Sequence, residues 1–193
     1  MSDAIAGADG RLRCPWAGAT PDYREYHDRE WGQLVTSTRG LYERLTLEAF
    51  QSGLSWLTIL RKRENFRAAF ASFDPVAVAA FDAADVSRLL ADVGIVRNKI
   101  KIEAAIHNAR VIAELGDDFA AIVLAFADHD RPRPTSLAEI AAQTPESVAL
   151  SKALKKVGIR FVGPTTAYAL MQAVGLVDDH LADCFVEIAP VAR

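Results

Sequence analysis

Apolar residues recur at helical spacing along most of the chain. From Thr38 onward, Leu41, Leu45 and Ala49 repeat every three or four residues until Gly53 interrupts the run, which is the repeat of one helix face. The same spacing, with capping residues, prolines and glycines at the boundaries, predicts further helices at residues 56–70, from 74 onward, and at 82–94, 99–115, 145–158 and 164–174. Since no segment alternates apolar and polar residues as a β-strand does, we predict an all-α protein.

The start of the chain differs in character from this helical body. Residues 1–10 are small and polar, and they are predicted to form a disordered tail. Residues 11–37 are rich in aromatic residues, proline and glycine, which predicts loops and short turns. Further along, Ser136 and Glu139 have the spacing of a helix capping box. We expect residues 11–190 to form a single domain.

The composition is that of a globular domain without membrane contact. Of the 193 residues, 51% are hydrophobic, which supplies a sizeable core, but no run approaches the roughly 20 apolar residues of a membrane span. The net charge of −3 argues against binding to nucleic acid through bulk charge. Local basic clusters are present, such as residues 61–63 and the pair Lys155 and Lys156. Each of them has the alternative interpretation of an ordinary solvated helix face.

The two cysteines of the chain lie near its opposite ends, each with a histidine nearby. Cys14 is followed by His27, and His180 is followed by Cys184. Two thiolates and two imidazoles form a complete tetrahedral set for zinc, and one such ion would join the two ends of the chain. The spacing alone also allows buried apolar cysteines and unrelated histidines. A disulfide is disfavoured because the first residues lack a signal-peptide pattern.

The segment between the last two predicted helices has the features of a helix–hairpin–helix motif, at about residues 150–174. One helix ends at Gly158, and Gly163 with Pro164 opens the next after a short turn. Free amides and the dipole at a helix N-terminus favour an anion such as a DNA phosphate, and glycine permits its close approach. An ordinary helical corner is the alternative. The candidate DNA-contact residues of this segment are Gly163, Thr165, Lys155 and Lys156.

A carboxylate and a group of aromatic residues suggest a pocket for a flat ligand. Glu48 falls on or beside the apolar face formed by Leu41 and Leu45, where a carboxylate is costly unless it is paired or used. It can accept hydrogen bonds from an exocyclic amine and favour a cationic base, and bases stack on aromatic faces. The aromatic residues concerned are Trp16, Tyr23, Tyr26, Trp31 and Trp56. A boundary carboxylate that reaches water, beside a plain aromatic core patch, is the alternative. Together with the hairpin, the pattern suggests a base flipped out of duplex DNA.

Several separated motifs resemble those of one enzyme family. They occupy residues 13–16, 23–32, 48–56, 61–66, 94–99, 151–156, 161–163 and 179–180. From about Arg13 to Cys184 the chain resembles the bacterial DNA-3-methyladenine glycosylase I family. It departs from the family pattern at Pro15, which replaces a small residue, and at Phe50, where some members have a polar side chain. Because Phe50 is close to the pocket helix, we expect it to affect substrate range.

The resemblance implies a helix–hairpin–helix DNA glycosylase fold whose N- and C-terminal segments, residues 14–27 and 180–184, are joined by one structural zinc. Four protein ligands leave no open position for water. The implied ligands are Cys14, His27, His180 and Cys184. The implied base pocket contains Glu48, as the catalytic and base-recognising carboxylate, with Tyr26, Tyr23, Trp16, Trp31 and Trp56. Leu54 matches the region that family members insert into the space left by the flipped nucleotide.

The activity implied by the resemblance is hydrolysis of the N-glycosidic bond of 3-methyladenine in double-stranded DNA, with the free base as product. N3-methylation makes the purine a cationic, good leaving group, so binding and electrostatics would carry catalysis. No lysine stands as an obvious nucleophile, so lyase activity is not expected, and Asp178 and Asp179 are interpreted as structural. We expect a cytoplasmic monomer.

Two other functions are compatible with parts of the pattern. A non-catalytic, zinc-clasped helix–hairpin–helix module would bind duplex DNA without releasing a base, and it would be indifferent to Glu48→Gln. A zinc hydrolase would need an open coordination position, which a set of two cysteines and two histidines denies.

Overall fold

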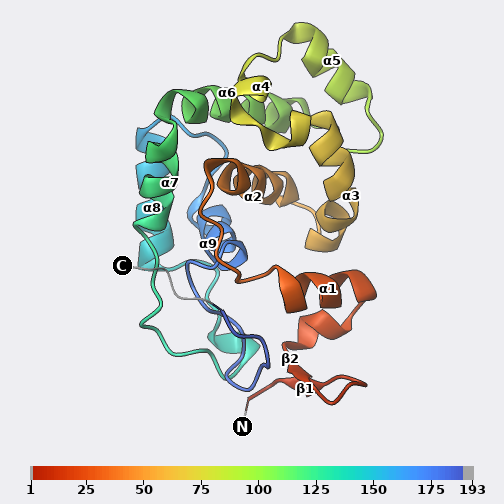
Figure 1. The fold of residues 1–193 in the computed structure, drawn as a ribbon, viewed down its shortest axis with the longest axis vertical. Helices are drawn as coiled ribbons and strands as arrows, with labels where there is room; N and C mark the ends of the chain where they lie inside the picture. Colours follow the sequence, from red (N-terminus) through yellow and green to blue (C-terminus); the bar gives the residue numbers. More distant parts are fainter. Residues whose placement is uncertain (1, 189–193) are drawn as a thin grey trace.

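Helix α2 (Thr38–Gln51) lies at the centre of the helical body, and other helices pack around it (Figure 1). The structure is a computed structural model that describes residues 2–188. The α-helices that pack directly on α2 include α3 (Trp56–Ala69), α6 (Lys99–Leu115), α7 (Asp117–Leu124) and α9 (Pro164–Ala173). The outer helices are α4 (Pro75–Ala79), α5 (Ala83–Ala91) and α8 (Pro145–Lys156), and the short 3-10 helices are η1 (Pro15–Gly18), η2 (Ala71–Phe73) and η3 (Leu137–Glu139).

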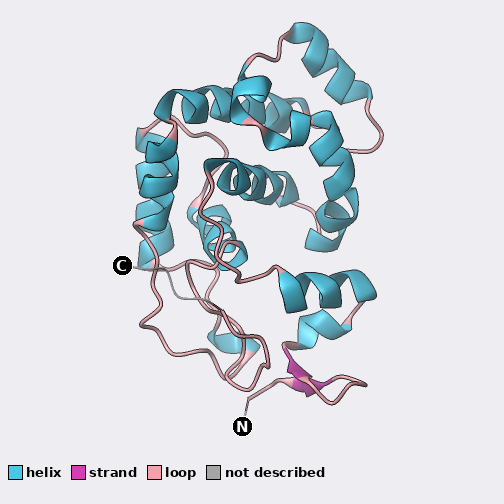
Figure 2. Cartoon of the chain, in the orientation of Figure 1, coloured by secondary structure: helices cyan, strands magenta, loops and turns pink. Residues whose placement is uncertain are grey.

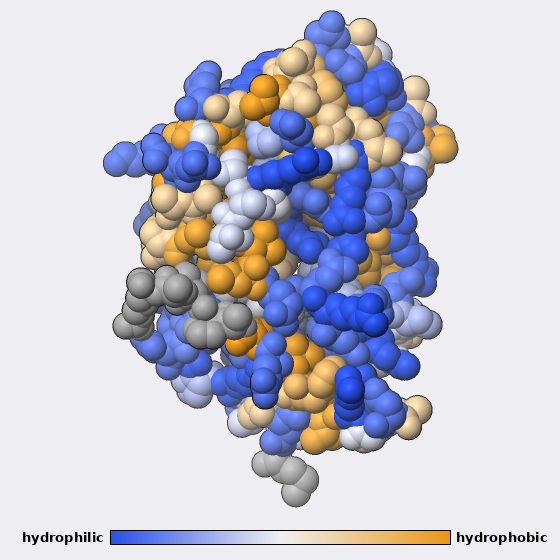
Figure 3. Space-filling model, viewed as in Figure 1, coloured by the Kyte–Doolittle hydropathy of each residue, from blue (hydrophilic) through white to orange (hydrophobic). Residues whose placement is uncertain are grey.

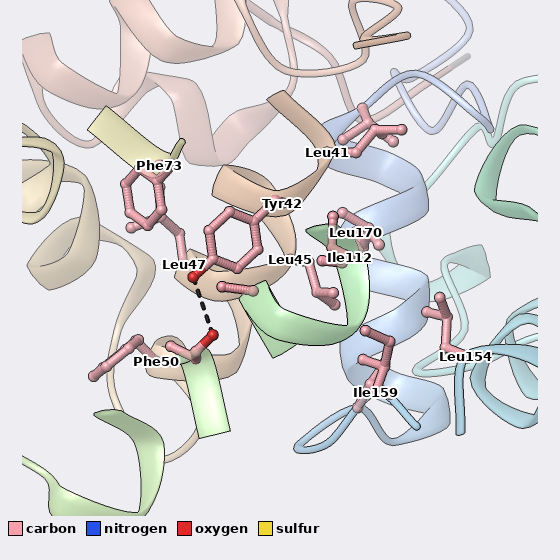
Figure 4. Packing of buried hydrophobic residues seen from close by; sticks show 14 of the residues in the cluster. Leu41, Tyr42, Leu45, Leu47, Phe50, Phe73, Ile112, Leu154, Ile159 and Leu170 are labelled. Atoms are coloured by element: carbon pink, nitrogen blue, oxygen red, sulfur yellow. Dashed lines mark hydrogen bonds between the residues drawn. The ribbon is translucent and has the colours of Figure 1, made fainter. Parts of the chain in front are cut away.

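The core of this body is built from the apolar residues that α2 directs toward its neighbours. Leu41, Leu45 and Phe50 are buried in one continuous cluster (Figure 4), which confirms the predicted helical spacing. Tyr42 is buried as well, and its hydroxyl donates to the carbonyl of Ala105 on α6 at 3.0 Å. This bond satisfies the only polar atom of a side chain that otherwise belongs to the core.

The first and last segments of the chain meet in a second region beside the helical body. It contains β1 (Ile5–Ala6), β2 (Leu12–Arg13), η1 and α1 (Pro21–Arg29), below the body in Figure 1. The amide of Phe185 donates to the carbonyl of Leu12 at 2.9 Å, and α1 packs against η1 and α3. We call this region the terminal lobe, defined as residues 2–31 with residues 178–188.

The predicted disordered tail is wrong for residues 2–10. Strands β1 and β2 pair antiparallel, shown in magenta in Figure 2, so the all-α prediction needs a small correction to a mostly helical chain. Buried Arg13 donates to the carboxylates of Asp9 and Asp28 at 2.7 and 2.8 Å, which fixes the ribbon to α1. Two-residue strands held by distant partners leave no periodic signal in a sequence. Met1 and residues 189–190, the last of the predicted domain, lie outside the described residues.

Three local predictions also need correction. Residues 11–37 contain helix α1, which the pattern missed because only Tyr26 and His27 of its residues are buried. Helix α7 follows α6 after a single glycine and was also missed. Ser136 forms no side-chain cap. Instead, the Glu139 carboxylate accepts hydrogen bonds from the amide and hydroxyl of Thr135, at 2.7 and 2.8 Å.

Across residues 2–188, no helix combines the length and the apolar character that crossing a bilayer requires. On the face shown in Figure 3, hydrophobic residues form separate patches among hydrophilic ones rather than a continuous band.

Gly175, just after α9, lies against the backbone of residues 32–34, which connect the terminal lobe to α2. Its φ is +73°, and an added Cβ would overlap the carbonyl oxygen of Gly32 and lie 2.8 Å from the carbonyl carbon of Gln33. We therefore expect Gly175→Ala to lower the free energy of unfolding by more than about 2 kcal/mol, as measured by denaturant titration. Gly10→Ala is the matched control, because Gly10 has a φ of +76° with no atom in reach of a Cβ. Equal losses in the two variants would contradict the role of this close approach.

Candidate functional site

A cavity of about 290 Å³ lies where α1, α2, α9 and the start of α3 meet. Its lining residues are Trp16, Ala19, Tyr23, Tyr26, Trp31, Glu48, Gln51, Trp56, Ala169 and Gln172. The structure thus brings together the candidate carboxylate and all five candidate aromatic residues of the predicted base pocket, although they come from η1, α1, the turn after α1, α2 and the start of α3. The volume suits a single bicyclic ligand rather than a large cofactor.

The aromatic side chains of the cavity pack against one another at steep angles. Trp16 makes edge-to-face contacts with Tyr23 and Trp31, at centroid distances of 5.7 and 5.1 Å. The rings of Tyr26 and Trp56 also pack on each other, with their centroids 5.3 Å apart. Tyr23 and Tyr26 share one face of α1 because they are three residues apart. Such packing holds the rings before any ligand arrives, which lowers the ordering cost of binding a flat group.

Glu48 is a buried acid without a counter-ion of its own. Glu48 is only 6% exposed, and its carboxylate accepts no hydrogen bond from residues 2–188. Burial raises the pKa of Glu48 to about 8, against a smaller opposing effect of the Arg44 charge. The group therefore carries a proton at neutral pH, and a cationic ligand would favour its ionised form.

The Arg44 charge is already engaged by another carboxylate. Arg44 and Arg63 both donate to Glu30, at 2.9 and 2.6 Å. Burial opposes ionisation of Glu30, but the hydrogen bonds from Arg63 and Arg44 outweigh it and lower the pKa of Glu30 to about 2. This ion cluster lowers the pKa of Glu30, whereas burial without a hydrogen-bond partner raises that of Glu48.

A groove leads from the cavity to the turn between α8 and α9. A hollow of about 210 Å³ shares Glu48, Gln51 and Ala169 with the cavity and also contains Leu54 and Thr165. A further hollow of about 370 Å³ continues along Ser52 and Thr166 to the helical turn. Its other lining residues are Lys155, Phe161, Val162 and Gly163. Of the candidate DNA-contact residues, Leu54, Gly163, Thr165 and Lys155 line this groove, whereas Lys156 is exposed outside it.

The helical turn itself is held from α6. Nδ2 of Asn108 donates to the carbonyl of Arg160 at 3.0 Å, and the amide of Arg160 donates back to Oδ1 of Asn108 at 2.8 Å. Gly163 is the N-cap of α9 and provides no side-chain hydrogen bond, so the first amides of α9 are free for a ligand. No neighbouring atom lies within 4 Å of the position a Cβ would take at Gly163, so that side of the turn is open.

Three of the four candidate metal ligands form a buried cluster. The donor atoms of Cys14, His27 and Cys184 all lie within 4.8 Å of one another. His180, the fourth candidate, is not in that group, but its ring centroid is 5.1 Å from that of His27. We call these four residues the metal clasp.

The surroundings of the two histidines fit metal ligation. Nδ1 of His27 lies 2.8 Å from Oδ1 of Asp28, and Nδ1 of His180 lies 3.0 Å from Oδ1 of Asp178. A carboxylate on Nδ1 leaves Nε2 as the metal donor, and Nε2 of His180 is buried without a partner. The clasp also supports the cavity, because Trp16 packs on His27 at 5.1 Å and Trp31 on His180 at 4.6 Å.

Comparison with known proteins decides the family. The model of the methyladenine glycosylase family matches residues 16–187. The chain belongs to this family. It is 49% identical over 177 residues to DNA-3-methyladenine glycosylase 1 of Escherichia coli (strain K12), covering 89% of this chain and 95% of the relative. It is 43% identical over 180 residues to DNA-3-methyladenine glycosylase of Haemophilus influenzae (strain ATCC 51907 / DSM 11121 / KW20 / Rd), covering 89% and 96%.

Solved structures agree with this methyladenine glycosylase in fold. A crystal structure of 3-methyladenine DNA glycosylase I superposes with a TM-score of 0.85 at 48% identity, covering 90% of this chain and 98% of that one. The Staphylococcus aureus enzyme, in a study of 3-methyladenine recognition, gives a TM-score of 0.81 at 33% identity, covering 90% and 95%. The family resemblance predicted from the motifs is confirmed, and so is the mostly helical glycosylase fold.

Two residues near the pocket of this methyladenine glycosylase lie where the sequence alone did not place them. Phe50 is fully buried and packs on Phe66 at 4.8 Å, outside the cavity lining, so its expected effect on substrate range stays a prediction and would have to act indirectly. Two residues beyond Glu48, it lies on a different side of α2. Conversely, the sequence did not indicate Gln172, which lines the cavity from α9. Its position three residues after Ala169 places both residues on the same face of α9, and this spacing was the one signal in the sequence that could have indicated Gln172.

Proposed function

We propose that this protein is a monofunctional DNA glycosylase of base-excision repair that hydrolyses the N-glycosidic bond of 3-methyladenine in double-stranded alkylated DNA. The observation that carries the proposal is a buried, unpaired Glu48 in an aromatic cavity of single-base size. Curated relatives of the chain carry the name DNA-3-methyladenine glycosylase. The released product would be the free base, and we further propose a monomer that acts in the bacterial cytoplasm.

In the proposed mechanism the protein contributes binding of the flipped base and electrostatic stabilisation, without a covalent intermediate. N3-methylation places a positive charge on the purine, so the base leaves as a neutral molecule when the C1′–N9 bond breaks and water attacks C1′. Glu48 would give up its proton to solvent as the cation enters, and then accept a hydrogen bond from the exocyclic amine. The rings of Tyr26, Trp56 and their neighbours would enclose the flipped base and exclude water. With no lysine in the cavity lining, no Schiff-base step is proposed.

DNA would approach along the groove. A backbone phosphate would dock at the free amides of Thr165 and Thr166, which follow Gly163 and Pro164 at the start of α9, with Lys155 and Lys156 supplying charge. Leu54, which is 43% exposed between α2 and α3, would occupy the space left by the flipped nucleotide. One zinc, held by Cys14, His27, His180 and Cys184, would join the chain ends as a structural ion.

The double substitution Lys155→Gln/Lys156→Gln tests this docking mode. We expect duplex affinity to fall and the slope of log affinity against log salt to decrease by about 2, since each neutralised phosphate contributes about 0.9. Affinity for the free base should be unchanged. Arg24→Gln/Arg29→Gln removes the same charge from exposed positions of α1 and serves as the control. An equal change of slope in both variants would indicate a general charge effect and contradict docking at the turn.

The proposed activity itself is tested by incubating the protein with methylated duplex DNA and identifying released bases by mass spectrometry. We expect 3-methyladenine without strand cleavage. Duplex binding without any base release would overturn the proposal in favour of the non-catalytic DNA-binding module. Release that requires an exchangeable metal-bound water would favour a zinc hydrolase instead.

A further inference from the structure

Gln172 has one end of its amide fixed and the other end free. Nε2 donates to Oδ2 of Asp179 at 2.7 Å. Asp179 is itself 2% exposed and accepts a hydrogen bond from the hydroxyl of Tyr168 at 2.6 Å and another from Nη2 of Arg131. Arg131 also donates to the Tyr168 hydroxyl at 3.0 Å. A buried network therefore determines which way the Gln172 amide faces.

The chemistry of this network decides the orientation of the amide. A carboxylate that pairs with arginine only accepts hydrogen bonds, so the nitrogen of Gln172 must face Asp179 and the oxygen must face away. Among residues 2–188, Oε1 of Gln172 makes no hydrogen bond, and it is not one of the fully buried unpaired atoms. Since Gln172 lines the same cavity as Glu48, but from α9 rather than α2, its oxygen is a free acceptor on the cavity side.

We propose that Gln172 is a specificity-determining residue whose amide oxygen accepts a hydrogen bond from the 6-amino group of the bound purine. This inference rests on the proposed function. A 6-amino group has two N–H donors, and two acceptors from different helices, Glu48 on α2 and Gln172 on α9, would satisfy both. A 6-oxo purine such as 3-methylguanine places an acceptor at the same point, where it meets the fixed amide oxygen and repels it. The pocket thus selects adenine-type over guanine-type bases, beyond what aromatic stacking and cation recognition provide.

The test compares free 3-methyladenine and free 3-methylguanine, with binding followed by the fluorescence of the cavity tryptophans. Gln172→Met keeps the length of the side chain but removes the acceptor. We expect it to weaken 3-methyladenine binding by about tenfold or more and to strengthen 3-methylguanine binding, because the repelling oxygen is gone. Gln143→Met, at an exposed position, is the matched control. Equal losses for both bases, or no loss for 3-methyladenine, would overturn the inference.

A second variant leaves Gln172 itself in place. Asp179→Asn replaces an acceptor-only group by one that also donates, so the Gln172 amide can turn over and offer an N–H to the cavity. The ratio of 3-methyladenine to 3-methylguanine affinity should then fall by about tenfold or more; an unchanged ratio in a folded variant would contradict the inference. Wild-type protein that neither binds nor releases 3-methyladenine would instead defeat the proposed function, so the two failures are distinguishable.

Discussion

Glu48→Gln is expected to reduce release of 3-methyladenine by about a hundredfold or more while leaving duplex affinity nearly intact. Glutamine has the shape of glutamate but lacks the negative charge that the cationic base requires in a water-poor cavity, where such a contact is worth about 3–4 kcal/mol. Single-turnover base release on methylated DNA measures the effect. Glu43→Gln is the control, since Glu43 lies on the same helix and pairs with Arg67 outside the cavity. Normal release by Glu48→Gln would leave the carboxylate without a catalytic role.

The same variant is expected to be more stable than the wild type at neutral pH, because burying the ionisable carboxyl of Glu48 lowers the free energy of unfolding. Its folded pKa of about 8 exceeds the ordinary 4.5. Between these values the unfolded carboxyl ionises while the buried one keeps its proton, so wild-type stability falls as pH rises. The gain for glutamine should be near zero at pH 4 and reach about 3 kcal/mol at pH 7. Denaturant unfolding at several pH values measures it, and parallel pH profiles for both proteins would contradict the assignment.

Cys184→Ala is expected to abolish binding of the proposed structural zinc and to destabilise the terminal lobe. Three remaining ligands do not complete the tetrahedral shell, and zinc binding and folding are coupled in such sites. We expect the zinc content to fall from one per chain to almost none and the melting temperature to drop by about 10 °C or more. Affinity for 3-methyladenine should fall as well, because Trp16 and Trp31 pack on the clasp histidines.

Metal analysis of two histidine variants sharpens this prediction. His180→Ala should behave like Cys184→Ala if the unpartnered Nε2 of His180 is the fourth donor. His129→Ala, a histidine outside the clasp, should keep its zinc. A Cys184→Ala protein that retains one zinc per chain and melts like the wild type would show that the clasp does not bind zinc in the proposed way.

The helical body was predictable because its signals are local. Asp82 caps α5 in the structure, with Asp85 completing a capping box, and Thr144 with Pro145 opens α8. Helix α1 gave too little apolar periodicity to be recognised, since most of its residues face water. The order of residues 2–10 depends on partners at the far end of the chain, such as Asp183, which accepts a hydrogen bond from the Ser2 hydroxyl at 2.8 Å.

The candidate site also contains residues that the sequence indicated and residues that it did not. The family motifs indicated Glu48 and the five aromatic residues, and the fold places them around one cavity. Gln172 could not be found from its neighbours in the sequence, because its orientation depends on a carboxylate one loop away that is itself held by Arg131. The Arg44–Glu30–Arg63 cluster was missed for the same reason, since its three members come from two helices and a turn. Pairings between distant polar residues leave no periodic pattern.

The meeting of the first and last segments in the terminal lobe has a consequence for biosynthesis. Leu12 and Cys14 accept hydrogen bonds from the backbone of Phe185 and Leu181, so this part of the protein remains incomplete while the ribosome is still translating the final helix. The helical body can form earlier, from contacts among residues 38–174, but Trp31 gains its support only when His180 emerges. A nascent chain that ends before residue 178 would therefore present a folded body with an unfinished pocket, and catalytic competence would arise only after residues 178–188 have been made.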